Sequence, residues 1–232
     1  MIPEPSTAGG PLLLGPSPGV KRMFLGHYSS AFAAKALVPR VPLWSVLLAA
    51  QLVDIFWVLL VLGGVEHVRL VSDLPSNPLD LYDMPYTHSL VATVAWSLLA
   101  FAAARRALGL ERLAASAVAA VVASHWLLDL VVHRPDLPIG FGVKVGLAMW
   151  NYPVPAYLLE VVLIVASAVL AIRANTLAGR ALRGWIALTG GLVLLQTGAS
   201  FGPFPSSLPA IILPAFATSK VCVNLVRICA FA

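Results

Sequence analysis

Charge is what this sequence has least of. Only 11% of its 232 residues are charged, whereas soluble domains carry about 25%. Hydrophobic residues make up 59% of the chain, and the mean hydropathy is +0.90. This composition excludes an ordinary soluble domain. It predicts one all-α domain over residues 23–232, a polytopic bundle of about five to six transmembrane helices.

Cysteine is equally scarce. Cys222 and Cys229 are the only two, and they form no CxxC pair. At a spacing of seven on one helix they face the same way and cannot bridge, so we interpret them as packing residues. The chain also has no Gly-rich phosphate loop and no HExxH motif. A thiolate metal site and the hydrolase classes defined by those motifs are therefore excluded.

The N-terminus has no long apolar run. Residues 1–22 are rich in Pro, Gly and Ser, and their one apolar stretch is PLLL. That stretch is shorter than the ~7–15 residues of a signal-peptide core. We expect a disordered tail here, so that membrane insertion depends on the internal helices.

Long apolar runs do recur further along the chain. A spanning helix needs about 20 apolar residues. Candidates lie at 42–63, 87–104, 114–133, 151–172 and 184–201, with a weaker, proline-interrupted one at 208–231. Residues 23–38 precede Pro39 and Pro42. They predict a short helix that doubles back beside the first span and crosses half of the membrane.

The net charge of +5 comes from basic residues that lie between the apolar runs. We interpret them as topology signals and predict no nucleic-acid partner. The loops at 105–113 and 173–183 hold three Arg residues each, which assigns them to the cytoplasm by the positive-inside rule. The poorly basic loops at 64–86 and 134–150 then face outward.

Ionisable residues interrupt the apolar runs at one predicted depth. His125, Asp129 and His133 follow at intervals of four and share one helical face. At about 1.5 Å per residue, this stripe and the others fall in the outer half of the bilayer. Four predicted spans and the half-membrane helix contribute to the layer. The complete set is His27, Asp54, His88, His125, Asp129, His133 and Glu160.

Imidazole together with carboxylate is the ligand mixture of zinc and related divalent ions. Any one of these residues alone could be a packing residue that bonds to a neighbouring carbonyl. The whole set could hold two ions, or one ion with supporting residues and a general base. Because ionisable groups inside a membrane are costly, their gathering at one depth indicates function.

The order of these residues resembles that of a known family. LGHYSSAFAAK, QLVDIFW, YTHSL, SHWLLD and GLAMWNYPVPAYLLE are similar to motifs of the YdjM-like membrane-bound metal-dependent hydrolases of the bacterial inner membrane. The similarity covers about residues 24–162. It extends distantly to zinc-dependent phospholipase C and single-strand nucleases, which are all-helical enzymes with three zinc ions.

The resemblance implies that all seven residues are metal ligands for one to three divalent ions, with zinc expected. Asp54 and Glu160 are expected to act as bridging ligand or general base. The implied reaction is hydrolysis of a phosphoester in a lipid or envelope-associated substrate, on the outer side of the bacterial inner membrane.

Two other functions fit the same residues. Buried His and carboxylate groups could form a proton or ion relay in a transporter, which breaks near Pro209 and in the NYPVP segment would favour. Alternatively, a structural membrane protein could keep the scaffold without chemistry. Stoichiometric bound metal would favour the hydrolase, and pH-dependent flux would favour the transporter.

Overall fold

Prolines and a serine cap determine where several helices begin and end. The computed structural model describes residues 25–71, 74, 79–140 and 142–201, so the predictions for 1–22 and 208–231 lie outside the described residues. Pro39 and Pro42 separate the first two helices, and Pro153 opens the sixth at its first position. The Ser89 hydroxyl caps the fourth helix by accepting the Ala92 N–H at 3.0 Å. The helices are η1 (Leu25–His27), α1 (Tyr28–Leu37), α2 (Leu43–Ala50), α3 (Leu52–Leu62), α4 (Leu90–Arg106), α5 (Arg112–Val132), η2 (Met149–Asn151), α6 (Pro153–Ala174) and α7 (Gly179–Phe201).

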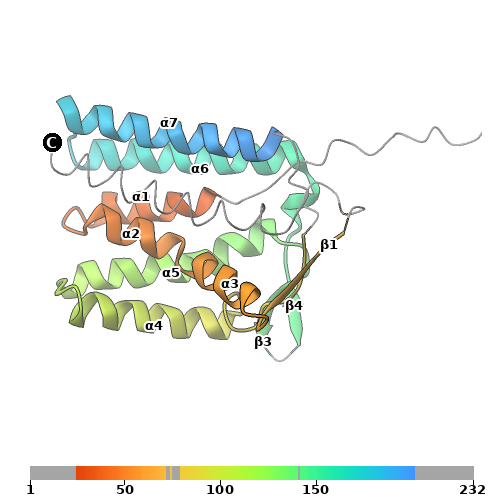
Figure 1. The fold of residues 1–232 in the computed structure, drawn as a ribbon. Coiled ribbons are helices and arrows are strands. Elements are labelled where there is room, and N and C mark those ends of the chain that lie inside the picture. The colour runs from red at the N-terminus through yellow and green to blue at the C-terminus, as the bar shows by residue number, and fades with distance from the viewer. Residues whose placement is uncertain (1–24, 72–73, 75–78, 141, 202–232) are drawn as a thin grey trace, which may run out of the picture.

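The helices lie side by side in layers (Figure 1). Helices α6 and α7 form one edge, α1 and α2 lie in the middle, and α5 and α4 form the other edge. Helix α1 packs against both α2 and α6, and η1 lies against α5 and α6. The predicted doubling back of the short N-terminal helix is therefore observed, and it carries His27 to the face of α5.

The described part of the chain holds three helices long and apolar enough to cross a membrane: α5, α6 and α7. Helices α2 and α3 would count as a fourth span if they are taken together, although they are bent by 44° at Gln51. Helix α4 has 17 residues, slightly fewer than the ~20 that a full crossing needs. The chain is thus a mostly helical protein with three helices that are long and apolar enough to span a membrane. The count of five to six spans stays a prediction.

Two antiparallel hairpins lie within the segments predicted as the loops at 64–86 and 134–150. Strands β1 (His67–Leu70) and β2 (Leu79–Asp83) form one, and β3 (Leu137–Gly140) and β4 (Val143–Val145) form the other. In LDLYD, the side chains of Leu79 and Leu81 are buried while Tyr82 is exposed, as expected for one covered face of a strand. The protein is therefore mostly but not entirely α-helical. Each strand is so short that the apolar signal of the spans dominates the sequence pattern.

The apolar interior has two separate parts. The bundle core lies among α1, α2, α5, α6 and α7 and includes Phe32, Val46, Val122 and Ile164. A second group, which we name the cap cluster, lies beneath the hairpins. It consists of Trp57, Val58, Leu79, Leu81, Met84, Trp126, Val132, Leu137 and Trp150. The predicted polar residues lie where these two parts meet.

Candidate metal centre

Six of the seven predicted residues meet at the hairpin end of the bundle. His27 ends η1, Asp54 lies in the first turn of α3, and His88 immediately precedes the cap of α4. His125 and Asp129 belong to α5, and His133 is its C-cap. The four histidines and Asp129 are at most 5% exposed. Residues up to 106 positions apart in the sequence thus share one buried site.

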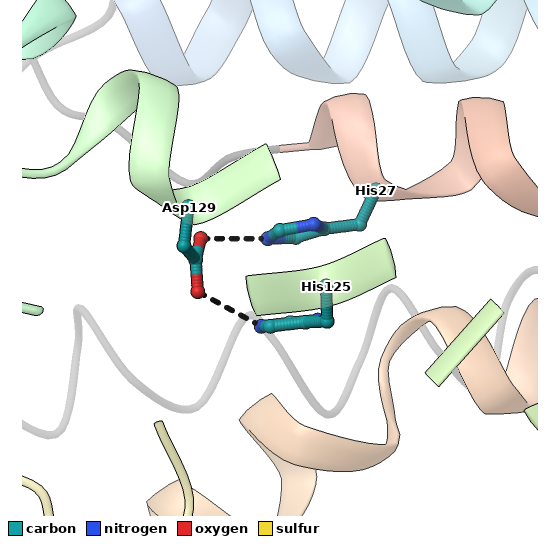
Figure 2. A group of neighbouring side chains, drawn as sticks. All are labelled: His27, His125 and Asp129. Carbon is teal, nitrogen blue, oxygen red and sulfur yellow. Dashed lines mark ion pairs between the residues drawn. The ribbon is translucent and has the colours of Figure 1, made fainter. Parts of the chain in front are cut away.

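Asp129 lies at the centre of the site. Its Oδ1 is 3.2 Å from His27 Nε2 and 3.6 Å from His133 Nε2. Its Oδ2 is 3.3 Å from His125 Nε2 and 3.7 Å from His88 Nε2. Figure 2 shows the His27 and His125 rings stacked, with 3.7 Å between centroids, each pointing to a different oxygen of this carboxylate. One carboxylate therefore faces four imidazoles.

Asp54 provides the second carboxylate. Its Oδ1 is 3.4 Å from His88 Nε2 and 3.5 Å from His125 Nε2. The Asp54 side chain is 26% exposed, whereas those of the two histidines are at most 6% exposed. The site is thus closed on most sides and open at Asp54.

Two overlapping triads have the composition of a metal site. His27, His125 and Asp129 form one, and Asp54, His88 and His125 form the other. In each triad the potential ligand atoms lie within 4.8 Å of one another. Two imidazoles and one carboxylate suit zinc or a similar divalent ion. His125 belongs to both triads, so an ion in either one would depend on it.

Oxygen atoms behind three of the histidines fix which ring nitrogen faces the site. His125 Nδ1 lies 3.1 Å from the Ala50 carbonyl, at the break between α2 and α3. His133 Nδ1 lies 2.9 Å from Asp136 Oδ1, and His88 Nδ1 lies 2.8 Å from the Thr87 hydroxyl. Carbonyl and carboxylate oxygens only accept hydrogen bonds, so Nδ1 of His125 and of His133 carries the proton. Such outer partners orient metal-binding histidines.

This arrangement turns Nε2 lone pairs toward carboxylate oxygens. Two acceptors at 3.3–3.6 Å repel each other unless a proton or a cation lies between them. The donor set therefore fits a divalent ion, which would satisfy the imidazole and carboxylate groups together. Hydrogen bonds among the ligands alone would require extra protons on the rings.

His133 lies at the edge of the site, just after the end of α5. Burial disfavours its protonated form, but the nearby carboxylates of Asp129 and Asp136 outweigh this effect and raise the pKa of His133. Its ring also packs against Trp150 of the cap cluster, with 4.4 Å between centroids. His133 therefore links the candidate site to the cap cluster.

Glu160 is fully buried on α6 and belongs to neither triad. Helix α6 packs against η1, the turn that carries His27. A role for Glu160 as ligand or general base stays a prediction. His67, by contrast, lies on the exposed hairpin, where its Nδ1 is 2.6 Å from Asp83 Oδ2. It is the one histidine outside the centre, as its place in a loop suggested.

Three supporting residues were missed. Asp136 and Glu66 belong to segments that the sequence analysis assigned to outward loops, yet Glu66 is only 1% exposed. Thr87 was noted only as part of the THS motif, although its hydroxyl contacts the His88 ring. Adjacency to His88 was the available signal for Thr87. For Glu66, 21 positions away, no sequence pattern indicated the contact.

Comparison with known proteins finds no matching family model, no matching curated protein and no matching solved structure. The resemblance to the YdjM-like hydrolases therefore stays a prediction. The geometry of the site is therefore the basis for its proposed function.

Proposed function

We propose that this protein is a membrane-embedded metal-dependent hydrolase with zinc as the expected metal. One observation carries the proposal. Four imidazoles direct Nε2 at the carboxylates of Asp129 and Asp54, and three of them have Nδ1 held from behind. A divalent cation is the ligand for which such a set of acceptors is suited.

A catalytic metal is favoured over a purely structural one because the protein ligands of each triad would leave a coordination position open for water or substrate. Structural zinc sites are closed by four protein ligands, whereas catalytic sites combine three with an open position. Each triad offers three ligands, and Asp54 is partly exposed. When bound, a divalent ion supplies Lewis acidity and activates water for attack on an ester.

Residues of this chain supply the remaining requirements. Asp54 is the carboxylate that solvent and substrate reach, so it is placed to accept a proton as a general base. Trp57 lies edge-on to His88 at 6.1 Å between centroids and, with the rest of the cap cluster, shields the site from water. A partly dry site strengthens electrostatic interactions with a charged substrate.

The proposed substrate is a phosphoester in a lipid or another envelope-associated molecule. Support comes from the position of the site at one end of the spanning helices, near the predicted membrane surface. The arginine-rich loops at 105–113 and 173–183 support an outward-facing site by the positive-inside rule. The proposed location is therefore the bacterial inner membrane, with the site facing outward.

Ion transport is a second candidate, favoured by one feature. The 44° bend at Gln51 divides the first apolar segment, and the Ala50 carbonyl beside it contacts His125. Transporters bind ions at such discontinuous helices. The NYPVP segment gives no further support, because it forms the end of η2 and the start of α6 rather than a break within a span. Pro209 lies outside the described residues.

Metal content and hydrolysis together test the proposal. Detergent-purified protein should contain near-stoichiometric zinc or manganese by elemental analysis, and His125→Ala should lose it. The wild type should hydrolyse a chromogenic phosphodiester or phospholipids in mixed micelles, and Asp54→Asn should lose this activity while keeping its fold. Metal-free wild-type protein that mediates pH-dependent ion flux in vesicles would instead support the transporter.

A further inference from the structure

A buried carboxylate outside the candidate metal centre is hydrogen-bonded to Thr87, the residue that contacts the His88 ring. Glu66 lies between α3 and β1 and is 1% exposed. Its Oε1 accepts the backbone N–H of Tyr86 at 2.8 Å and of Thr87 at 3.0 Å. Its Oε2 accepts the Thr87 hydroxyl at 2.6 Å. Because a buried carboxylate is costly unless its oxygens are satisfied, this set of bonds fixes Glu66 firmly.

The Thr87 hydroxyl then has only one way to bond to His88. A hydroxyl has a single hydrogen, and an ionised carboxylate can only accept. The hydrogen therefore points to Glu66 Oε2, and the Thr87 oxygen must accept at its other side. The neighbour there is His88 Nδ1 at 2.8 Å, so this nitrogen carries the ring proton. His88 Nε2 is left with its lone pair toward Asp54, at 3.4 Å from Oδ1.

His88 needs this arrangement more than its neighbours do. His125 and His133 are held by a carbonyl and a carboxylate, which are acceptors in every circumstance. A hydroxyl can donate or accept, so Thr87 alone would leave the His88 tautomer undetermined. Glu66 removes this ambiguity by taking the only hydrogen that Thr87 can give.

We propose that Glu66 and Thr87 are positioning residues that lock His88 in the Nδ1–H tautomer and so keep Nε2 available as a ligand. Their contribution to metal binding rests on the proposed metal centre, whereas the tautomer itself is a property of the metal-free chain. Neither residue is placed in contact with the ion or the substrate. Outer partners of this kind typically change metal affinity by about 10–100-fold when they are replaced.

Glu66→Gln would reverse the chain of hydrogen bonds without changing its shape. The amide oxygen must stay on the two backbone N–H groups of Tyr86 and Thr87, which need an acceptor. The amide nitrogen then faces the Thr87 oxygen and donates to it. The Thr87 hydrogen turns to His88 Nδ1, and the ring proton moves to Nε2, where it blocks coordination and points at Asp54.

Two substitutions at Thr87 complete the test. Thr87→Ser keeps the hydroxyl and should behave as the wild type. Thr87→Val keeps the shape but removes the only outer partner of His88 Nδ1 described here, so both tautomers become accessible. This variant also tests the proposal if Glu66→Gln does not fold.

The experiment uses full-length protein in detergent, labelled with ¹⁵N-histidine and stripped of metal by a chelator. The ¹⁵N shifts of the imidazole nitrogens distinguish protonated from bare nitrogen, and the spectrum of His88→Gln assigns the His88 signals. Zinc affinity is measured on the same samples by competition with a chromophoric chelator. Wild type and Thr87→Ser should show Nδ1–H at His88 and the same affinity. Glu66→Gln should show Nε2–H and bind zinc about 10–100-fold more weakly, and Thr87→Val should show a mixture with an intermediate loss.

The two readouts separate the two proposals. If Glu66→Gln keeps the Nδ1–H tautomer, or if it changes tautomer but binds zinc as the wild type does, the positioning role is wrong. If the wild type itself binds no zinc, the metal centre is wrong. The tautomer comparison then still decides whether Glu66 controls His88.

Discussion

Replacement of His125 should abolish the stabilisation of the protein by zinc, because His125 is the residue that both triads share. We choose His125→Gln, which keeps a polar side chain of similar reach in the buried space beneath His27. The matched control is His67→Gln on the exposed hairpin, where the imidazole pairs with Asp83 and stacks on Tyr82, away from both triads. Both proteins are compared with and without zinc, so that any loss of packing cancels from the result.

The expected magnitude follows from linkage. An ion that binds only the folded state at a free concentration of 100 times its Kd stabilises that state by about 2.7 kcal/mol. For a chain of this size, each kcal/mol shifts the Tm by roughly 2–4 °C, which gives a shift of about 5–11 °C. His67→Gln should keep that shift, and His125→Gln should lose nearly all of it.

Thermal unfolding followed by tryptophan fluorescence measures this shift in detergent, in chelator or in buffered zinc. The six tryptophans include Trp57, Trp126 and Trp150 of the cap cluster, so the signal reports on the surroundings of the site. A zinc-dependent shift of wild-type size in His125→Gln would mean that the stabilising ion binds elsewhere. If zinc does not raise the Tm of the wild type, the proposal that these residues bind a cation is wrong.

Two further predictions concern the C-terminal end of α5. Gly146→Ala should destabilise the fold by about 1–3 kcal/mol, because its Cβ would overlap the carbonyl oxygens of Arg134 and His133. Gly190→Ala on α7 has open space and should be neutral or stabilising; equal thermal stability of the two variants would contradict this explanation. In metal-free protein, the raised pKa of His133 should stabilise the fold below its ordinary value of 6.5, and this contribution should be lost as the pH rises through the raised value. The free energy of unfolding, measured by chemical denaturation of the chelated protein, should therefore fall less steeply with rising pH in His133→Gln than in the wild type. Identical pH dependences would exclude the effect.

Spacing along the chain was sufficient to predict most of the candidate site. Intervals of four predicted a shared face for His125, Asp129 and His133, and the prolines at 39 and 42 predicted that the short helix carrying His27 doubles back. The structure brings these residues together because helical pitch and rise convert sequence distance into position around and along a helix. Whether the residues bind metal stays a prediction that the experiments above decide.

Contacts that depend on irregular backbone could not be predicted in this way. The short hairpins give little apolar signal beside the long spans, so Glu66 was assigned only to an outward-facing loop although it is buried. The bend at Gln51 occurs within residues 43–62, which contain neither proline nor glycine. The Ala50 carbonyl could therefore not be foreseen as the partner of His125. Tertiary contacts, not local propensity, determine both features.

The division of the interior into bundle core and cap cluster determines the order in which heat would damage this protein. His27 and His125 are held by helices of the bundle, whereas His133 packs on Trp150 in the cap. Local unfolding begins where buried apolar contacts are fewest, and the short hairpins have few of them. Warming would then unfold the cap first and release His133, while the helices that hold His27 and His125 are still packed together. The highest temperature at which the site stays intact would then be the temperature at which the two small hairpins unfold, below the temperature at which the helices separate.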